Sequence, residues 1–360
     1  MLRQKLALAL TLCAVMPPAF LLADSELKEG TPDIKHAGPM AFAPHGVLLV
    51  GDTLSAAIYA IDTGDDQAAS GEKSINIEGV NQKIAAMLGS DAAETVINDI
   101  AVNPVSGNLY LSVARGRGPD AAPVIFKADS KGTLSEVSLK KVKFSKAAIA
   151  NAPESKEAPR GNPRMSAITD LQYKDGKVVV AGLSNEDFAS KLRVLKYPFD
   201  GSSQSTSIEV YHGAHGKLET ASPVRTFTTY EDTVLAAYTC TPLVSIPVED
   251  LKDGAKIKGK TIAELGNHNQ PLDMIVYKKG NQDFLLMSNS ARGVMKLKLS
   301  KGDIDSTKAI DSQIATTAGL PFETLKDLKD VVQLDKLNAN QAVLLVSNAG
   351  RQDVRTIDLP

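Results

Sequence analysis

Short apolar strands separated by turns recur six times along this chain of 360 residues. Each unit has an apolar strand, a turn, a second apolar strand that ends in a small or polar residue, and a third strand. The units begin near Gly38, Asn98, Thr169, Arg225, Leu272 and Lys329. Regular β-rich repeats are typical of β-propellers, so the pattern predicts an all-β propeller over residues 38–360. Six blades are expected, and seven are the alternative if one blade lies in an insertion.

The spacing also predicts how the ring closes. The last unit ends at Pro360 after its third strand, so its fourth strand is expected to come from residues 24–37. Residues 81–88 are predicted to form a short helix, and residues 144–165, rich in Ala, Pro and charge, a long loop. Third strands are expected at 124–128, 192–197, 243–246, 294–299 and 354–357. Weaker fourth strands are expected at 74–77, 137–142, 207–211 and 261–265.

The N-terminus has the pattern of a signal peptide. Arg3 and Lys5 precede an apolar stretch from Leu6 to Val15, and Ala23 precedes a polar run. We therefore expect residues 1–23 to be a signal peptide, residues 24–37 a polar lead-in, and the mature protein to be periplasmic or secreted. Cleavage would leave Cys240 as the single cysteine, which excludes an intramolecular disulfide.

Charge and missing motifs exclude several classes of partner. The net charge is −2 and no basic stripe is present, which argues against nucleic acid. Outside the N-terminus no apolar run approaches the ~20 residues that span a bilayer. No CxxCH motif suggests haem, and no glycine-rich phosphate loop suggests a nucleotide.

Propeller geometry collects distant polar residues on one face. The start of each first strand and the end of each second strand lie at the same mouth of the ring, with the loops that join the blades. Oxygen ligands there suit Ca²⁺ or Mg²⁺. The candidate set is Asp99, Asp170, Asn185, Asp273 and Asp330. The alternative is structural, because an aspartate repeated at strand starts can accept backbone N–H bonds in the turns.

A second candidate set combines nitrogen and sulfur ligands for zinc or copper. Its members are His212, His215, His268 and Cys240. The histidines are also candidate catalytic residues. Gly213 and Gly216 argue against a helix, so His212 and His215 are expected on an exposed, flexible turn. A variant with both histidines replaced by alanine is therefore expected to fold. The alternative for the histidines is that they form local hydrogen bonds in the turn, and the alternative for Cys240 is a buried, structural thiol.

Arginine and asparagine side chains are expected near the same face. A guanidinium there can bind a carboxylate or phosphate, and its alternative is pairing with the neighbouring aspartates. The candidate ligand-binding residues are Arg225, Asn289, Arg292, Asn348 and Arg351.

The repeat pattern over most of residues 38–358 resembles in outline the six-bladed propellers that include gluconolactonases, senescence marker proteins, strictosidine synthase and NHL-repeat proteins. The resemblance implies a secreted bacterial β-propeller. Lactonase-type members hold one divalent metal through Glu, Asn and Asp near the channel, which implies Asp170, Asn185 and Asp273 here. Glu219 lies in a blade-joining loop and does not match the inner Glu.

Three functions remain open from the sequence. We expect an exported propeller that binds a small ligand, a metal ion or a protein of the cell envelope on the blade-joining face. The alternative is a metal-dependent hydrolase or lactonase that uses a bound cation as Lewis acid and a histidine as base. A minor alternative is an accessory subunit of a periplasmic redox enzyme. Fold alone does not decide among them.

Overall fold

The computed structural model describes residues 27–68, 73–118, 120–159, 161–240 and 242–360. The predicted signal peptide, residues 1–23, lies outside the described residues. Most of the described chain is β-strand, which agrees with the all-β prediction. The predicted short helix is confirmed as α1 (Val80–Leu88), and a second helix is α2 (Lys301–Ser306). Short 3-10 turns are η1 (Pro44–Gly46), η2 (Ala92–Glu94), η3 (Pro163–Ser166) and η4 (Val248–Asp250).

The described strands run as six antiparallel meanders in chain order, and these pair into five sheets. The first contains β2 (Ala37–Ala43), β3 (Val47–Asp52) and β4 (Ala57–Asp62), and the second β5 (Thr95–Val102), β6 (Leu109–Arg115), β7 (Ala122–Ala128) and β8 (Leu134–Glu136). The third contains β10 (Asp170–Lys174), β11 (Lys177–Leu183), β12 (Ser190–Lys196) and β13 (Ser203–His212), and the fourth β15 (Val224–Tyr230), β16 (Thr233–Tyr238), β17 (Pro242–Pro247) and β18 (Lys256–Glu264). The fifth contains β19 (Pro271–Lys279), β20 (Gln282–Asn289), β21 (Gly293–Leu299) and β23 (Phe322–Leu325), and the sixth β24 (Val331–Lys336), β25 (Gln341–Asn348) and β26 (Arg351–Asp358). Each predicted third strand overlaps one of these elements.

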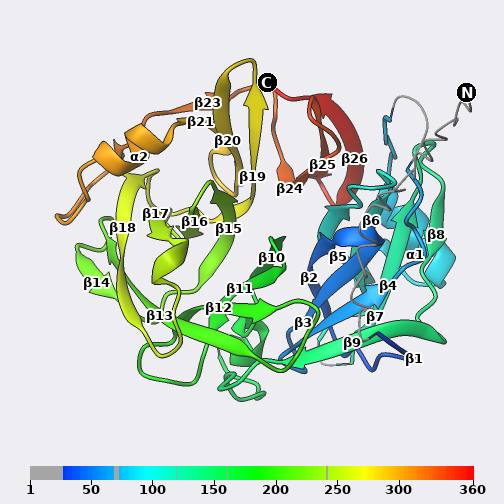
Figure 1. The fold of residues 1–360 in the computed structure, drawn as a ribbon. Coiled ribbons are helices and arrows are strands. Elements are labelled where there is room, and N and C mark those ends of the chain that lie inside the picture. The colour runs from blue at the N-terminus through cyan, green and yellow to red at the C-terminus, as the bar shows by residue number, and fades with distance from the viewer. Residues whose placement is uncertain (1–26, 69–72, 119, 160, 241) are drawn as a thin grey trace, which may run out of the picture.

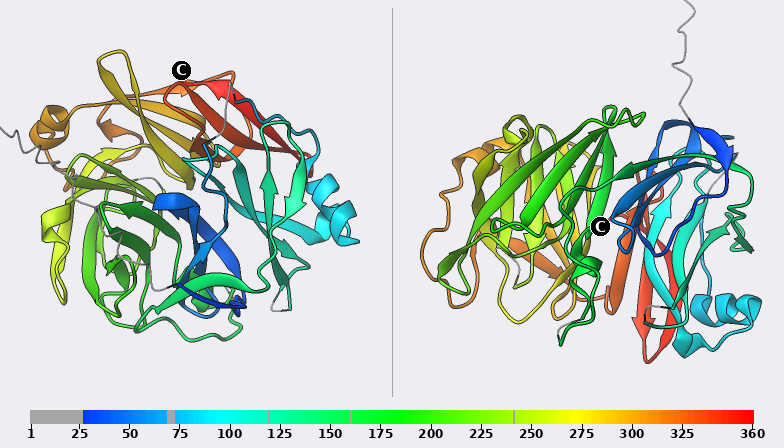
Figure 2. Two further views of the ribbon diagram at one scale, coloured as in Figure 1. Left: turned by 45° about the vertical axis from the view of Figure 1, so that its right-hand side comes forward. Right: turned by 90° about the horizontal axis from the view of Figure 1, so that it is seen from below.

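The first strands of the meanders surround a central axis in a β-propeller arrangement (Figure 2). Around the axis, β2 contacts β5, β5 contacts β24, β24 contacts β19, β19 contacts β15, β15 contacts β10, and β10 contacts β2. The first meander therefore lies between the second and the third, and the second lies next to the sixth (Figure 1). The order around the ring differs from the order along the chain.

Outer strands explain this order, and they correct the predicted closure. β9 (Val142–Ala148) follows the second meander in sequence but pairs with β4 of the first. β1 (Lys28–Gly30) pairs with β9, so the described part of the predicted segment, residues 27–37, does not supply the fourth strand of the last unit. Ile77 bridges Val354 of β26 instead. The expected loop over 144–165 is thus partly a strand, and the expected fourth strand at 137–142 is replaced by β8.

The third and fourth meanders join into one ten-stranded sheet. β13 pairs in parallel with β18 through Ser207–Val210 and Lys256–Gly259. β13 then continues into a hairpin with β14 (Lys217–Glu219), and β22 (Ala318–Gly319) pairs with the far end of β18. This parallel pair carries the end of β13 over the fourth meander.

Apolar side chains fill the spaces between neighbouring sheets. The largest cluster lies among the third, fourth and fifth meanders and includes Leu192, Leu235, Tyr238, Leu243 and Leu285, all essentially buried. Strands buried on both faces need apolar residues at nearly every position, as in β16, which is buried along its whole length. Core packing is therefore continuous between blades, as a closed ring requires.

Aspartate side chains fasten neighbouring first strands around the channel. Each carboxylate accepts a hydrogen bond from a backbone N–H group in the first strand of the meander beside it in the ring. The bonds are Met40 N–H to Asp99 (2.6 Å), Phe227 N–H to Asp170 (2.8 Å), Leu334 N–H to Asp273 (2.8 Å) and Val102 N–H to Asp335 (2.7 Å). These bonds satisfy donors that no strand ladder reaches. They agree with the structural role that the sequence offered as the alternative to a metal site at the repeated aspartates.

Burial and mutual repulsion alter the ionisation of these carboxyls. Burial raises the pKa of Asp170 to about 7 and that of Asp335 to about 6, although backbone N–H bonds oppose the shift. Burial and neighbouring carboxylates hold the pKa of Asp99 and Asp273 well above the usual range. The folded protein therefore holds protons on these carboxyls at higher pH than the unfolded chain does.

We predict that Ile77→Ala lowers the free energy of unfolding by about 2–5 kcal/mol, the cost of a cavity at a buried isoleucine. Ile77 is 2% exposed and holds the chain against β26. Urea unfolding measures the change. The control Glu78→Ala removes an exposed neighbour and should change stability by less than about 0.5 kcal/mol. Equal effects of both variants would contradict the closure by this segment.

We predict that the protein becomes less stable as the pH rises from about 5 to about 8. Carboxyls whose folded pKa exceeds the unfolded value of 3.8 contribute stability at low pH and lose it as the pH passes through the folded values near 6 and 7. The expected loss is about 1–2 kcal/mol, because Asp170 and Asp335 are only partly buried and solvent therefore screens part of the effect. Asp170→Asn should reduce the slope of stability against pH, whereas an unchanged slope would show that Asp170 does not titrate in this range.

Candidate functional site

Three of the predicted nitrogen and sulfur ligands lie together where the third and fourth meanders meet. One ligand atom each from His212, His215 and Cys240 lies within 4.8 Å of the other two. His212 ends β13, His215 lies in the turn to β14, and Cys240 follows β16. Among the residues that the structure describes, these three form the cluster of histidine, cysteine and acidic side chains able to share an ion. His268 is exposed on the next loop and is not part of it.

The local sequence folds the two histidines against each other. His215 and Gly216 both donate their N–H groups to the His212 carbonyl, at 3.1 and 2.8 Å, which closes the turn. Gly216 adopts a positive φ of 66°, a conformation that favours glycine. The imidazole rings come to rest with their centres 3.8 Å apart and tilted by 36°. The glycines that argued against a helix thus allow the close turn.

Glu219 holds both imidazoles from the opposite strand of the hairpin. Its two oxygens lie 3.0 Å from His212 Nδ1 and 2.7 Å from His215 Nδ1. Ser222 donates a further hydrogen bond to the same carboxylate. Burial alone would raise the pKa of Glu219, but the bonds from Ser222 and the histidines lower it to about 2. A permanently ionised carboxylate therefore fixes the orientation of both rings.

One ring nitrogen of His212 is buried and free of hydrogen bonds. The residue is 1% exposed, which corrects the expectation of an exposed turn. Burial lowers the pKa of His212, so the ring is neutral near pH 7. With Nδ1–H donating to Glu219, Nε2 carries a lone pair, and it has no hydrogen-bond partner among the described atoms. A buried acceptor without a partner is costly, and a metal ion would satisfy it.

Cys240 is positioned through its backbone. Its φ is 59°, an unusual value for a residue other than glycine, and its N–H donates to the Asn269 carbonyl at 2.8 Å. Asn269 is buried and accepts a bond from the Asn289 amide at 3.0 Å. Asn289 therefore supports the cysteine loop in this structure, rather than facing the channel as a ligand-binding side chain.

The turn is also anchored from below by Glu264. Gly213 donates its N–H to Glu264, and burial raises the pKa of this carboxyl to about 7. Thr261 binds the Tyr211 carbonyl at 2.7 Å. Both partners belong to β18, so the parallel pairing of β13 with β18 places the histidine turn beside the end of β16.

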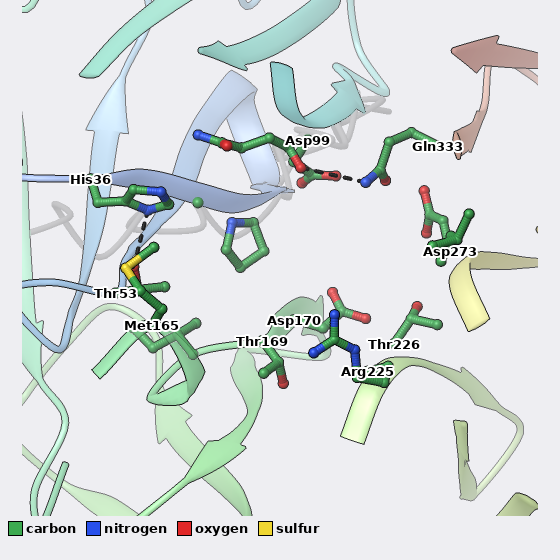
Figure 3. A pocket seen from close by; sticks show the side chains of 15 residues that line it. His36, Thr53, Asp99, Met165, Thr169, Asp170, Arg225, Thr226, Asp273 and Gln333 are labelled. Atoms are coloured by element: carbon green, nitrogen blue, oxygen red, sulfur yellow. Dashed lines mark hydrogen bonds between the residues drawn. The ribbon is translucent and has the colours of Figure 1, made fainter. Parts of the chain in front are cut away.

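The oxygen set is only partly brought together. Asp99, Asp170 and Asp273 line a cavity of about 320 Å³ at the mouth of the channel, together with Arg225 (Figure 3). With its amide nitrogen facing the carboxylates, Gln333 donates to Asp273 at 2.8 Å and to Asp99 at 3.2 Å. Asn185 and Asp330 do not line this cavity.

A register shift explains why Asp330 is misplaced by the sequence pattern. The first strand of most meanders carries an irregularity at its start, after which Asp99, Asp273 and Gln333 occupy equivalent positions. Asp330 precedes β24 and is exposed with a φ of 60°. One irregular residue is invisible in an apolar pattern, so the alignment of the repeats placed the wrong residue at the channel.

The remaining predicted residues lie apart from both sites. Asn348, Arg351 and Asp330 line a separate hollow of about 400 Å³, where Arg351 pairs with Glu78 and Asp353. Arg292 is half-buried, and its N–H donates to Asn289. These arginines do not converge on one ligand site.

Sequence reasoning missed Glu219, Gln333 and Asp335 as members of the two sites. Glu219 had a weak signal, since a hairpin after His212 would return an acidic residue toward the histidines. Asp335 had no signal in the sequence, because it lies inside β24 and the first strands of the other meanders carry no aspartate at the equivalent position.

No described helix has the length and apolar character needed to cross a membrane. No protein-family model and no curated protein matches the chain. Among solved structures, an aldose sugar dehydrogenase from Streptomyces coelicolor in its PQQ-bound form is similar at 11% identity and a TM-score of 0.35, over 91% of this chain and 95% of that one. A putative glucose dehydrogenase from Thermus thermophilus is similar at 12% identity and a TM-score of 0.35, over 92% and 99%. The WD40 propeller domain of Doa1 is similar at 9% identity and a TM-score of 0.33, over 92% and 96%. At these values the similarities carry no argument about activity.

Proposed function

We propose that this protein is an exported, six-bladed propeller that binds one transition-metal ion between its third and fourth blades. The proposed ligands are His212, His215 and the Cys240 thiolate. The observation that carries the proposal is the carboxylate of Glu219, which bonds to Nδ1 of both histidines and leaves the other ring nitrogens free. Ligating histidines characteristically hold a carboxylate or carbonyl with their second nitrogen.

The channel mouth is the weaker metal site. Asp99, Asp170 and Asp273 already accept backbone N–H bonds, and their raised pKa values oppose a negatively charged ring. A cation there would compete with bonds that fasten neighbouring blades. The turn site has no comparable conflict, because its free nitrogen is buried without a partner.

Mature protein purified without chelators or a histidine tag should contain about one zinc or copper ion per chain, measured by elemental analysis. With Zn²⁺ alone as the titrant, Glu219→Gln should weaken binding about 10–100-fold, because the rings lose their fixed orientation. Lys217→Ala is the matched control, since the exposed Lys217 side chain lies 3.7 Å from the same carboxylate but supplies no ligand atom. Its affinity should stay within about twofold.

Loss of Zn²⁺ binding in a Cys240→Ser, His215→Ala double variant that still folds, judged by circular dichroism, would support this site. Stoichiometric calcium or magnesium with no response to Glu219→Gln would instead favour the channel carboxylates. A protein that binds neither Zn²⁺ nor Cu²⁺ would reject the proposed function.

A further inference from the structure

We propose that the ion is copper and that the site exchanges one electron with an external carrier. This inference rests on the metal site proposed above. It depends on three features of the described residues: the kind of ligands, their number, and the way the thiol is held.

The ligands combine two imidazoles with one soft thiolate. This set suits copper, and trigonal His₂Cys geometry is typical of copper centres that transfer electrons. Bonds of about 2.0–2.3 Å would bring three ligand atoms to roughly 3.5–4 Å from one another. The observed spread, within 4.8 Å, therefore needs small movements of side chains on two loops.

The number of ligands favours a trigonal ion over a structural zinc. Structural zinc sites almost always use four protein ligands. In the described part of the chain the cluster offers three, since both oxygens of Glu219 already bond to the histidines. His268, the predicted fourth ligand, is exposed outside the cluster.

The backbone of Cys240 is held in place, and one imidazole faces solvent. The backbone bond of Cys240 to Asn269 and the Asn269–Asn289 pair hold the cysteine loop. His212 is buried, whereas the His215 side chain is 42% exposed. The exposed ring gives a single-electron carrier a short path to the ion while the thiolate stays partly covered.

The proposed step is balanced by the carrier. Cu²⁺ bound to the thiolate and both imidazoles accepts one electron from a reduced carrier and becomes Cu⁺, and the carrier is oxidised by one electron. The three metal–ligand bonds remain, and no proton needs to move. Reoxidation by a single-electron acceptor returns Cu²⁺.

The test titrates reduced, metal-free mature protein with Cu²⁺ in the absence of oxygen. One equivalent should produce an intense visible absorption from thiolate-to-copper charge transfer. Ascorbate should remove the colour and ferricyanide should restore it over repeated cycles. Cys240→Ser should lose the band completely, whereas His268→Ala, the matched control at an exposed histidine outside the cluster, should keep it.

Three outcomes would overturn the inference, and the last of them would also reject the proposed metal site. One-equivalent Zn²⁺ binding, together with Cu²⁺ that gives no thiolate band, would keep the proposed function and reject copper. Loss of the visible absorption together with a disulfide between two chains would show that Cu²⁺ oxidises Cys240 rather than being bound by it. If neither ion binds, the proposed function and the inference both fail.

Discussion

The ring depends on the hydrogen bonds that channel aspartates accept from backbone N–H groups of neighbouring first strands. First strands of adjacent blades contact each other but form no ladder, so their inward N–H groups need acceptors from side chains. Carboxylates of Asp99, Asp170, Asp273 and Asp335 reach across the gap, and each fixes the spacing of two blades. The cost is a group of crowded, buried carboxyls with raised pKa values.

Given that ring, the route of the chain decides where the outer strands go. The segment around Ile77, which precedes the second meander in the chain, bridges β26 at the edge of the sixth meander. β9, which follows the second meander in the chain, pairs with β4 at the edge of the first. Among the described residues, internal segments therefore close the ring, and residues 27–37 do not. On the other side, the parallel pairing of β13 with β18 binds the third and fourth meanders into one sheet and carries the histidine turn over the end of β16.

The candidate metal site is a consequence of that exceptional pairing. Its ligands come from a hairpin turn of one blade and a strand end of the next, and its orienting carboxylate, Glu219, comes from the returning strand of the hairpin. Burial of His212 excludes water from one side, while His215 keeps the other side open. The site is separate from the channel, so ligand chemistry at the turn need not disturb the bonds that hold the blades together.

The sequence by itself determined the all-β repeat, the third strands and the helix at residues 81–88, because strand and helix periodicity is local. Side-chain chemistry also made His212, His215 and Cys240 candidates for a soft-metal set, which stays a prediction. It misplaced Asp330, because a single irregular residue at a strand start shifts the register without changing the apolar pattern. Only the tertiary structure decided the order of the blades, the closure by Ile77, the exclusion of His268 and the role of Glu219. Each of these depends on contacts between segments far apart in the chain, and such contacts are set by packing and backbone pairing that no local pattern encodes.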